Sequence, residues 1–294
     1  MTKDETHGRI LVQMLPRVPS LTNRGLAGWA ILVGGTIVSL LLIMTLIAPW
    51  ISPHDPSALN VGPAMSPPSS KFPMGTNHLG EDMLSRVYFG GVVMFQVSFL
   101  SVIVCLIVGV PIGLFASFKG GYIDKFSSLV MDSIYAFPGL VLAIAIAAIL
   151  GPGVVNMALS IAVVYVPSYY RIIRSQVLTI KELSYVDAAR MMGAKTRTIL
   201  FSYILPNVVP SIVSIATINF ADAILTAAGL TFVGLGLSVS IPDWGWDLTY
   251  GRRLLTSGAW WVITFPGMMV ILLALGFTLL GEGLSEFFNP RLER

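Results

Sequence analysis

Long stretches without a charged residue constrain the fold of this chain more than any other feature. Residues 26–47, 87–118 and 133–170 contain no Asp, Glu, Lys or Arg. A helix that crosses the hydrocarbon core of a bilayer needs about 20 consecutive apolar residues. In the whole chain 55% of residues are hydrophobic and 11% are charged, whereas a soluble domain has about 25% charged residues. These values exclude an ordinary soluble globule, a coiled coil and a disordered chain.

We therefore predict an all-α, polytopic membrane protein with about six transmembrane helices. The uncharged stretch 133–170 is too long for one span, and Gly151-Pro152-Gly153 within it is a strong turn signal. It is expected to hold two spans. The six expected spans are residues 26–47, 92–118, 129–150, 154–172, 207–234 and 261–281.

The basic residues predict the orientation, because cytoplasmic loops are enriched in Lys and Arg. With the N-terminus inside, only Lys71, Arg86, Arg252 and Arg253 lie on outer segments. The other 14 lie on inner segments: Lys3, Arg9, Arg17, Arg24, Lys119, Lys125, Arg171, Arg174, Lys181, Arg190, Lys195, Arg197, Arg291 and Arg294. Both termini are expected in the cytoplasm of a cell that holds this protein in its plasma or inner membrane.

This topology divides the chain into expected regions. They are a cytoplasmic N-terminal segment (1–25), a first transmembrane helix (26–49), an extracytoplasmic loop (50–90), a five-helix core (91–285) with a cytoplasmic loop (173–205), and a cytoplasmic tail (286–294). The first helix is expected to be an uncleaved anchor, because no small-residue cleavage site follows it.

Two patterns make further local predictions. Gly109-x-x-x-Gly113 predicts close packing of two helices. A second outer loop, about 237–260, is rich in Trp and is expected at the membrane surface. Its charged residues, among them Asp243 and Asp247, are interpreted either as contacts for an external protein or as a solvated rim.

Sequence motifs for catalysis are absent. No Gly-Lys dipeptide occurs, so there is no phosphate-binding loop of the Walker type. A serine nucleophile needs a partnered base, and the three His residues all lie in the first 78 residues, outside the expected bundle. We expect no catalytic residue, no metal and no cofactor on this chain. Transport across the membrane, or anchoring of a complex, is favoured over an intramembrane enzyme.

The expected cytoplasmic loop contains a pattern for a short helix. Ser184-x-x-Asp187 is typical of a capping box, and Gly193 is placed to end the helix in the left-handed conformation. A second helical stretch is expected over residues 196–204, ending at Leu205-Pro206. Flexible methionines and small residues between these signals favour a docking surface; an ordinary capped surface loop is the alternative.

Residues 185–207 resemble the signature loop of ABC importer permeases, E-A-A-x(3)-G-x(9)-I-x-L-P. Asp187-Ala188-Ala189 corresponds to E-A-A, with Asp for Glu; Gly193 falls at the expected place, and Ile204-Leu205-Pro206 closes the stretch. In that family the loop forms a coupling helix that docks on a cytoplasmic ATPase subunit. The resemblance implies that the docking residues here are Tyr185, Asp187, Ala188, Ala189, Arg190, Met192, Gly193 and Ala194.

The resemblance extends over roughly residues 50–294. Residues 75–86 are similar to G-T-D-x-L-G-R-D-x-L-S-R of the dipeptide/oligopeptide/nickel branch, and the chain is most similar to its C-type permease subunit. Two departures are Glu81 in place of an Arg, and Ala227 or its neighbours in place of a Glu. Either departure bears on the choice of substrate or partner.

The family implies a type I ABC importer permease bundle that works with partners. These are a homologous permease, two ATPase subunits that hold ATP and Mg, and an external substrate-binding protein. Peptides are the expected cargo, with nickel or oligosaccharides as alternatives. A stand-alone secondary transporter or channel is the alternative of a different class.

One acidic residue is expected deep in the fifth span. Asp222 lies there with Asn219 nearly one turn before it, and an intramembrane acid is a functional-site candidate. Both are candidates for the translocation pathway. The other interpretation is a buried acid that is protonated or hydrogen-bonded between helices.

Overall fold

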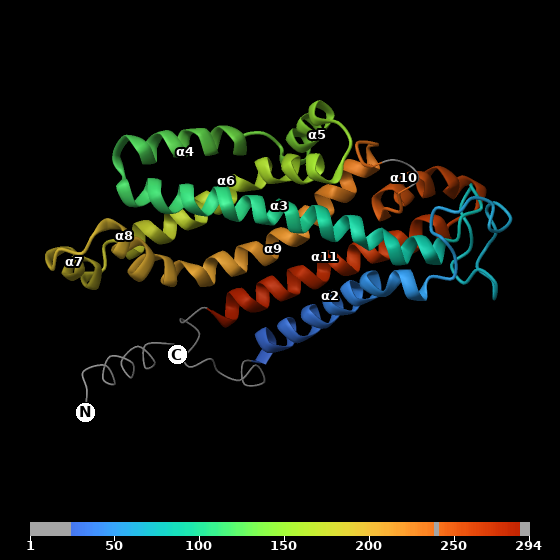
Figure 1. Cartoon of the computed structure of the whole chain (residues 1–294), viewed down its shortest axis with the longest axis horizontal. Coiled ribbons are helices and arrows are strands. Elements are labelled where there is room, and N and C mark those ends of the chain that lie inside the picture. Colours follow the sequence, from blue (N-terminus) through green and yellow to red (C-terminus); the bar gives the residue numbers. More distant parts are fainter. Residues whose placement is uncertain (1–24, 238–240, 289–294) are drawn as a thin grey trace.

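The computed structural model describes residues 25–237 and 241–288. The predictions for the N-terminal segment 1–24 and for the tail from residue 289 lie outside these ranges. The described chain is built from helices, and five long ones run side by side along the length of the molecule (Figure 1). They are α2 (Gly25–Ile51), α3 (Met83–Lys119), α6 (Val154–Ile180), α9 (Leu205–Phe232) and α11 (Trp261–Phe287).

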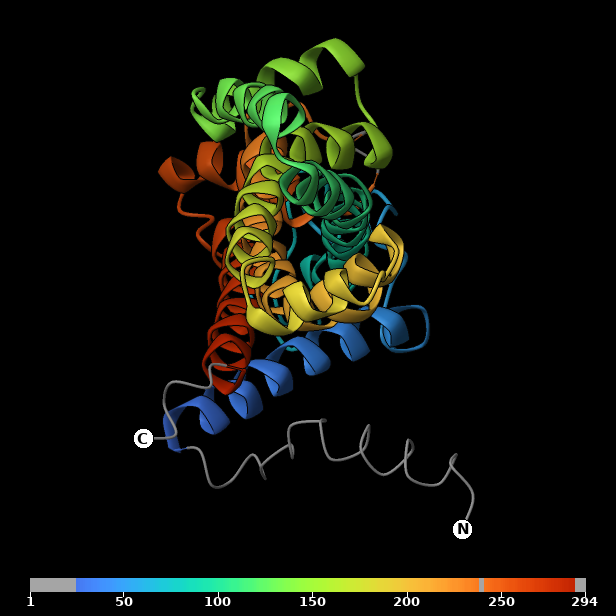
Figure 2. The ribbon, with the colours of Figure 1, turned by 90° about the vertical axis from the view of Figure 1, so that its left-hand side faces the viewer.

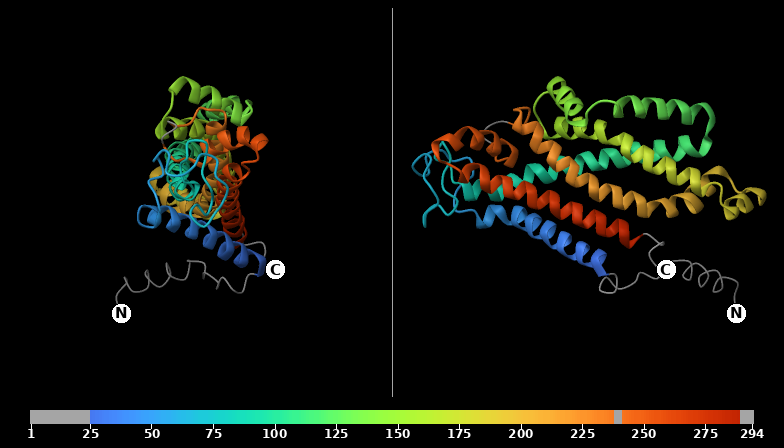
Figure 3. Two further views of the ribbon diagram at one scale, coloured as in Figure 1. Left: turned by 90° about the vertical axis from the view of Figure 1, so that its right-hand side faces the viewer. Right: turned by 180° about the vertical axis from the view of Figure 1, so that it is seen from behind.

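The molecule has two different ends, which are also visible from behind in Figure 3. At one end lie the short helices α7 (Ser184–Met191) and α8 (Thr196–Thr198). At the opposite end lie the loop of residues 52–82 and the helix α10 (Trp244–Leu254). We refer to them as the α7 end and the α10 end. Figure 2 looks onto the α7 end.

The described residues contain four helices that are long and apolar enough to cross a membrane, namely α2, α3, the segment Thr196–Phe232 and α11. The bent pair α4–α5 raises this number to five if it counts as one span. The fourth expected span, residues 154–172, corresponds to α6, which is as long as α2 but carries Arg171 and Arg174 in its second half. Membrane-spanning structure has to be helical here, because every backbone N–H and C=O in lipid needs an internal partner.

The third expected span, residues 129–150, is not one helix. α4 (Gly121–Tyr135) and α5 (Gly139–Leu150) meet at a bend of 89°. Pro138 lies at the break and is the N-cap residue of α5. Proline has no backbone N–H to donate and restricts the residue before it, so the helix ends there. The two helices lie on one side of the bundle, against α6 (Figure 1).

Glycines allow the long helices to approach closely. A Cβ atom at Gly109 would lie 2.7 Å from the Cβ of Tyr169, and one at Gly113 would lie 2.9 Å from the Cβ of Ile173. The predicted close packing at Gly109-x-x-x-Gly113 is therefore confirmed, between α3 and α6. A Cβ at Gly34 would lie 2.6 Å from the carbonyl oxygen of Gly276, so α2 packs against α11 in the same way.

Candidate functional site

The helix α7 begins without the predicted capping box. Leu183 is the N-cap residue, and no side chain accepts a hydrogen bond from the first amides. The capping-box prediction was wrong because Ser184 is already the first helical residue. The Asp187 carboxylate lies in the first turn and accepts a hydrogen bond from Arg190 Nη1 at 3.0 Å. Its negative charge still complements the positive end of the helix dipole.

The end of α7 is the glycine turn predicted from the sequence. Gly193 has φ +80°, in the left-handed region. Its N–H donates to the Arg190 carbonyl at 2.9 Å, and the Ala194 N–H donates to the Ala189 carbonyl at 3.0 Å. This pair of bonds is a Schellman motif, which satisfies carbonyls left free at a helix end.

Two side chains fix α7 to the bundle. Val186 and Ala189 are buried, and Val186 belongs to an apolar cluster with Ile199, Leu200 and Ile204. Ala189, predicted as a docking residue, instead packs against the protein's own core. Its burial supports α7 from beneath and removes it from the exposed surface.

The opposite face of α7 is exposed. Met191 and Met192 are 85% and 79% exposed. Tyr185, Asp187, Arg190 and Gly193 are also exposed, whereas Ala188 and Ala194 are half-buried. Met191 was not among the predicted docking residues, although its place in the same turn as Met192 indicated it. The exposed face therefore combines two methionines, a tyrosine and an Asp–Arg pair.

The helix α7 is joined to the long helix α9 by short contacts. The Asn207 side-chain amide donates to the Tyr185 hydroxyl at 3.3 Å, and the rings of Tyr185 and Tyr203 lie 6.4 Å apart. The chain between them is a π-helix, Ile199–Ile204, that runs directly into α9. The second helical stretch was predicted to end at Leu205-Pro206, but it continues through Pro206 into α9. Pro206 lies in the first turn of α9, where its missing N–H costs little.

The acid in the bundle has few polar neighbours. Asp222 is half-buried, and its side chain makes no hydrogen bond or ion pair with other described residues. Asn219 is buried, and its Oδ1 has no hydrogen-bond partner among the described residues. No described cation pairs with Asp222, so it is not an ion-paired structural acid.

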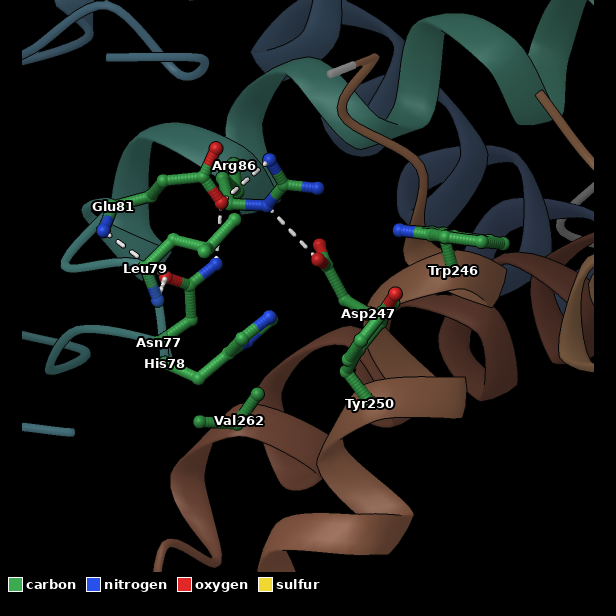
Figure 4. Close-up of a pocket in the computed structure, with 9 residues that line it drawn as sticks. All are labelled: Asn77, His78, Leu79, Glu81, Arg86, Trp246, Asp247, Tyr250 and Val262. Carbon is green, nitrogen blue, oxygen red and sulfur yellow. Dashed lines mark hydrogen bonds and ion pairs between the residues drawn. The ribbon is translucent and has the colours of Figure 1, made fainter. Parts of the chain in front are cut away.

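Sequence analysis did not anticipate a buried charged cluster at the α10 end. The Arg86 guanidinium donates through Nε to Asp247 Oδ1 at 2.9 Å, and through Nη1 to Glu81 Oε2 at 3.1 Å. Figure 4 shows the two carboxylates reaching Arg86 from different sides. Arg86 is 1% exposed, so these bonds form away from water. The cluster joins α3, the loop 52–82 and α10.

The cluster corrects two interpretations of single residues. Asp243 and Asp247 are buried and cannot be direct contacts for an external protein. Asp243 is the N-cap of α10 and accepts from the Gly245 N–H at 3.0 Å. Glu81, which replaces an Arg of the family motif, is buried too. Its carboxylate accepts hydrogen bonds from Arg86 and Asn77, so this replacement changes contacts inside the protein. Ala227 is also buried, in the apolar core.

The tryptophans of this end are partly internal. Trp244 is fully buried, lies against Gly90 and Gly91, and donates to the Val87 carbonyl at 2.9 Å. Trp261 is buried and donates to the Thr76 carbonyl at 2.9 Å. Trp260 is exposed, as expected of a headgroup-level residue. The loop is therefore a packed cap over the bundle end rather than a segment lying flat on the surface.

The sequence and fold match a known family of membrane proteins. Residues 109–294 match the family described as "Binding-protein-dependent transport system inner membrane component", and residues 29–68 match the "N-terminal TM domain of oligopeptide transport permease C". The chain therefore belongs to the binding-protein-dependent permeases, the non-enzymatic membrane subunits of ABC importers. It is a multi-pass membrane protein.

Three relatives are similar over nearly their whole length. The di/tripeptide transport system permease protein DppC of Pseudomonas aeruginosa is 38% identical over 88% of this chain and 88% of that protein. The dipeptide transport system permease protein DppC of Alkalihalophilus pseudofirmus is 37% identical over 89% and 86%. The glutathione transport system permease protein GsiD of Pectobacterium atrosepticum is 36% identical over 88% and 86%.

The described residues offer no metal site. Within residues 25–237 and 241–288, no group of three or more His, Cys, Asp or Glu side chains is placed to hold a metal ion. Cys105 is a free, buried cysteine in α3. The main features of the two ends are the exposed apolar face of α7 and the buried ion pairs beside α10.

Proposed function

We propose that this chain is the C-type permease subunit of an ATP-driven peptide importer. In this proposal it pairs with a homologous permease to form the translocation pathway. Two cytoplasmic ATPase subunits bind ATP and Mg and dock at the α7 ends, and an external binding protein delivers cargo at the α10 ends. Nickel and oligosaccharides are the alternative cargoes, and the names of the relatives favour peptides.

The exposed face of α7 carries this proposal. Met191 and Met192 expose apolar side chains that adapt to a groove, while Val186 holds the helix firmly on the bundle. A force applied to α7 reaches α9 through the continuous helix that starts at Thr196. A docking helix with a rigid connection to a membrane-spanning helix is what ATP-driven movement requires.

The distribution of basic residues supports a cytoplasmic α7 end. Eight described basic residues lie on the segments that the proposal assigns to the cytoplasmic side: Lys119, Lys125, Arg171, Arg174, Lys181, Arg190, Lys195 and Arg197. Only Lys71, Arg86, Arg252 and Arg253 lie at the α10 end. The excess on one side follows the positive-inside rule.

Reconstitution tests the assembly. The tagged chain should co-purify with a second permease and two ATPase subunits, and the complex in liposomes should take up peptides only with ATP and binding protein. Uptake by this chain alone would contradict the proposal and favour a secondary transporter. Uptake of nickel or an oligosaccharide instead of peptides by the same complex would correct only the cargo.

The pathway role of Asp222 is a second, separable part of the proposal. The half-buried carboxylate without a partner is positioned to meet the cationic amino terminus of a peptide. Asp222→Asn should weaken uptake of peptides with a free amino terminus more than uptake of N-acetylated ones. Equal uptake kinetics of mutant and wild type on both substrates would show that Asp222 is not part of the translocation pathway.

A further inference from the structure

The buried cluster at the α10 end holds more negative than positive charge. Three carboxylates, those of Glu81, Asp243 and Asp247, interact electrostatically with the single guanidinium of Arg86. Each of these four residues is at most 3% exposed. Buried charges without a counter-charge are strongly unfavourable, and such groups change their protonation state instead.

Hydrogen bonding identifies which carboxylate is least compensated. Arg86 donates to Glu81 Oε2 and to Asp247 Oδ1 but makes no hydrogen bond to Asp243. Asp243 is bonded only through Oδ1, by the Gly245 N–H, and its Oδ2 is buried without a partner among the described residues. Oδ2 of Asp247 is also unpartnered and lines the pocket in Figure 4.

The pocket between these residues excludes a bulky ligand. Its volume is about 10 Å³, which admits nothing larger than a water molecule. Its walls are formed in part by the stacked rings of His78 and Tyr250, whose centres are 4.6 Å apart. Asp243 does not line this pocket, and nothing larger than water reaches Arg86, Glu81 and Asp247 through it.

We propose that Asp243 is a proton-binding site that links the docking of α10 on α3 to the pH on the α10 side of the membrane. With its proton bound, the carboxyl is neutral and α10 stays packed over the Arg86 cluster. Loss of the proton adds a second uncompensated negative charge to the cluster, and this charge favours the opening of α10 toward water.

The charged and polar groups around Asp243 support this assignment. Burial is the largest cause and raises the pKa of Asp243 to about 7, while the Gly245 N–H and Arg86 of α3 act to lower it and Asp247 of α10 acts to raise it. Glu81 and His78 of the loop 52–82 lie beside Arg86, and burial lowers the pKa of His78. On α10 itself, Gly245 lies against the uncharged Thr231 of α9, and Gly251 lies against Ile263 of α11.

The sign of the pH effect follows from linkage. The pKa of Asp243 is raised when α10 is docked and is about 3.8 when the carboxyl is in water. Docking is therefore most favourable below the lower value and weakens as the pH rises toward the upper one. Between the two, opening releases one proton, so the opening equilibrium rises up to about tenfold per pH unit. Above about pH 7 it no longer changes.

Hydrogen exchange of residues 244–254 in the assembled transporter tests the proposal. After correction for the intrinsic rate, the opening equilibrium should rise at least about tenfold between about pH 5 and about pH 8. In Asp243→Asn, which keeps the N-cap acceptor, it should change less than about twofold. Asp55→Asn, which changes an exposed carboxylate of the loop 52–82 at the same end of the molecule, is the matched control and should behave as wild type.

A second measurement keeps the test independent of folding and of transport. Infrared difference spectra between acidic and alkaline pH should contain the carbonyl band of a protonated, buried carboxyl that is lost in Asp243→Asn. Wild-type pH dependence in Asp243→Asn, or its loss only in Asp247→Asn, would overturn the assignment. If the wild-type complex shows the carboxyl band of Asp243 but takes up no peptide, the proposed function is wrong and the proton-binding site still stands.

Discussion

Each end of the molecule has a short helix with an acidic residue that pairs with an arginine, but the pair is buried at one end and exposed at the other. At the α10 end, Arg86 and Asp247 pair at 2.9 Å in the protein interior. At the α7 end, Asp187 and Arg190 pair at 3.0 Å on the exposed surface. Trp244 at the first end is fully buried, while Met191 at the second is 85% exposed.

The difference supports the proposal that the α7 end is the one completed by another protein. An exposed pair of methionines on a firmly held helix is the kind of apolar surface that a partner would cover. The α10 end already buries Trp244, Trp261 and its ion pairs, so it is a preassembled cap. Substitutions should therefore affect folding at the α10 end and assembly at the α7 end.

Arg86→Leu should have the largest effect on stability. It leaves Glu81 and Asp247 buried without their counter-charge, which costs about 3–5 kcal/mol. Thermal unfolding of the purified protein in detergent measures the loss. Arg253→Leu, an exposed arginine of the same end, is the control. Equal stability of the two variants would contradict the buried network.

Val186→Ala tests how α7 is held. It removes two methyl groups from the buried side of the helix and should cost about 1–2 kcal/mol. Limited proteolysis at residues 181–195 should become faster, while proteolysis of the loop 52–82 should not change. Faster cleavage at both ends would show that the two ends are not independent.

Gly193→Asp should separate assembly from folding. A Cβ at this position meets no atom within 4 Å, so the only folding cost is the left-handed backbone, about 1 kcal/mol. The added charge lies beside the exposed methionines and should abolish co-purification of the ATPase subunits and ATP-driven uptake. A mutant complex with wild-type assembly and uptake would disprove docking at this turn.

Asp187→Asn should have the smallest effect on stability. Exposed ion pairs contribute about 0–1 kcal/mol, and the unfolding temperature should barely change. The control is Glu182→Gln, a nearby exposed acid outside α7. If the ATPase contacts Asp187, only Asp187→Asn should weaken ATPase binding. A large loss of stability would mean that the surface pair has a structural role.

Local signals in the sequence predicted the glycine turn that ends α7, although the capping box at its start was wrong. Gly193 was expected in the left-handed conformation because glycine alone adopts it without strain. The close packing at Gly109 and Gly113 was also predicted, because small residues four apart lie on one helix face. Both features depend on neighbours in the chain.

The α10 end was not predictable in the same way. Asp247 and Arg86 are separated by 161 positions, and no local pattern indicates that they meet. Their charge alone suggested an exposed rim. Pro138 predicts a kink in the third span, but the run of apolar residues continues through it. Hydropathy therefore did not separate one kinked span from two helices that meet at 89°.

Cysteine labelling at Met192 is the most direct test of the central claim that α7 docks on the ATPase. Cys105 is buried and should not react with a membrane-impermeant maleimide. In inside-out vesicles, Met192→Cys should label at least about tenfold more slowly with ATPase subunits present than after they are stripped. Leu59→Cys, exposed at the α10 end, should not react in these vesicles and should label in right-side-out ones. Equal labelling of Met192→Cys with and without the ATPase subunits would contradict the account.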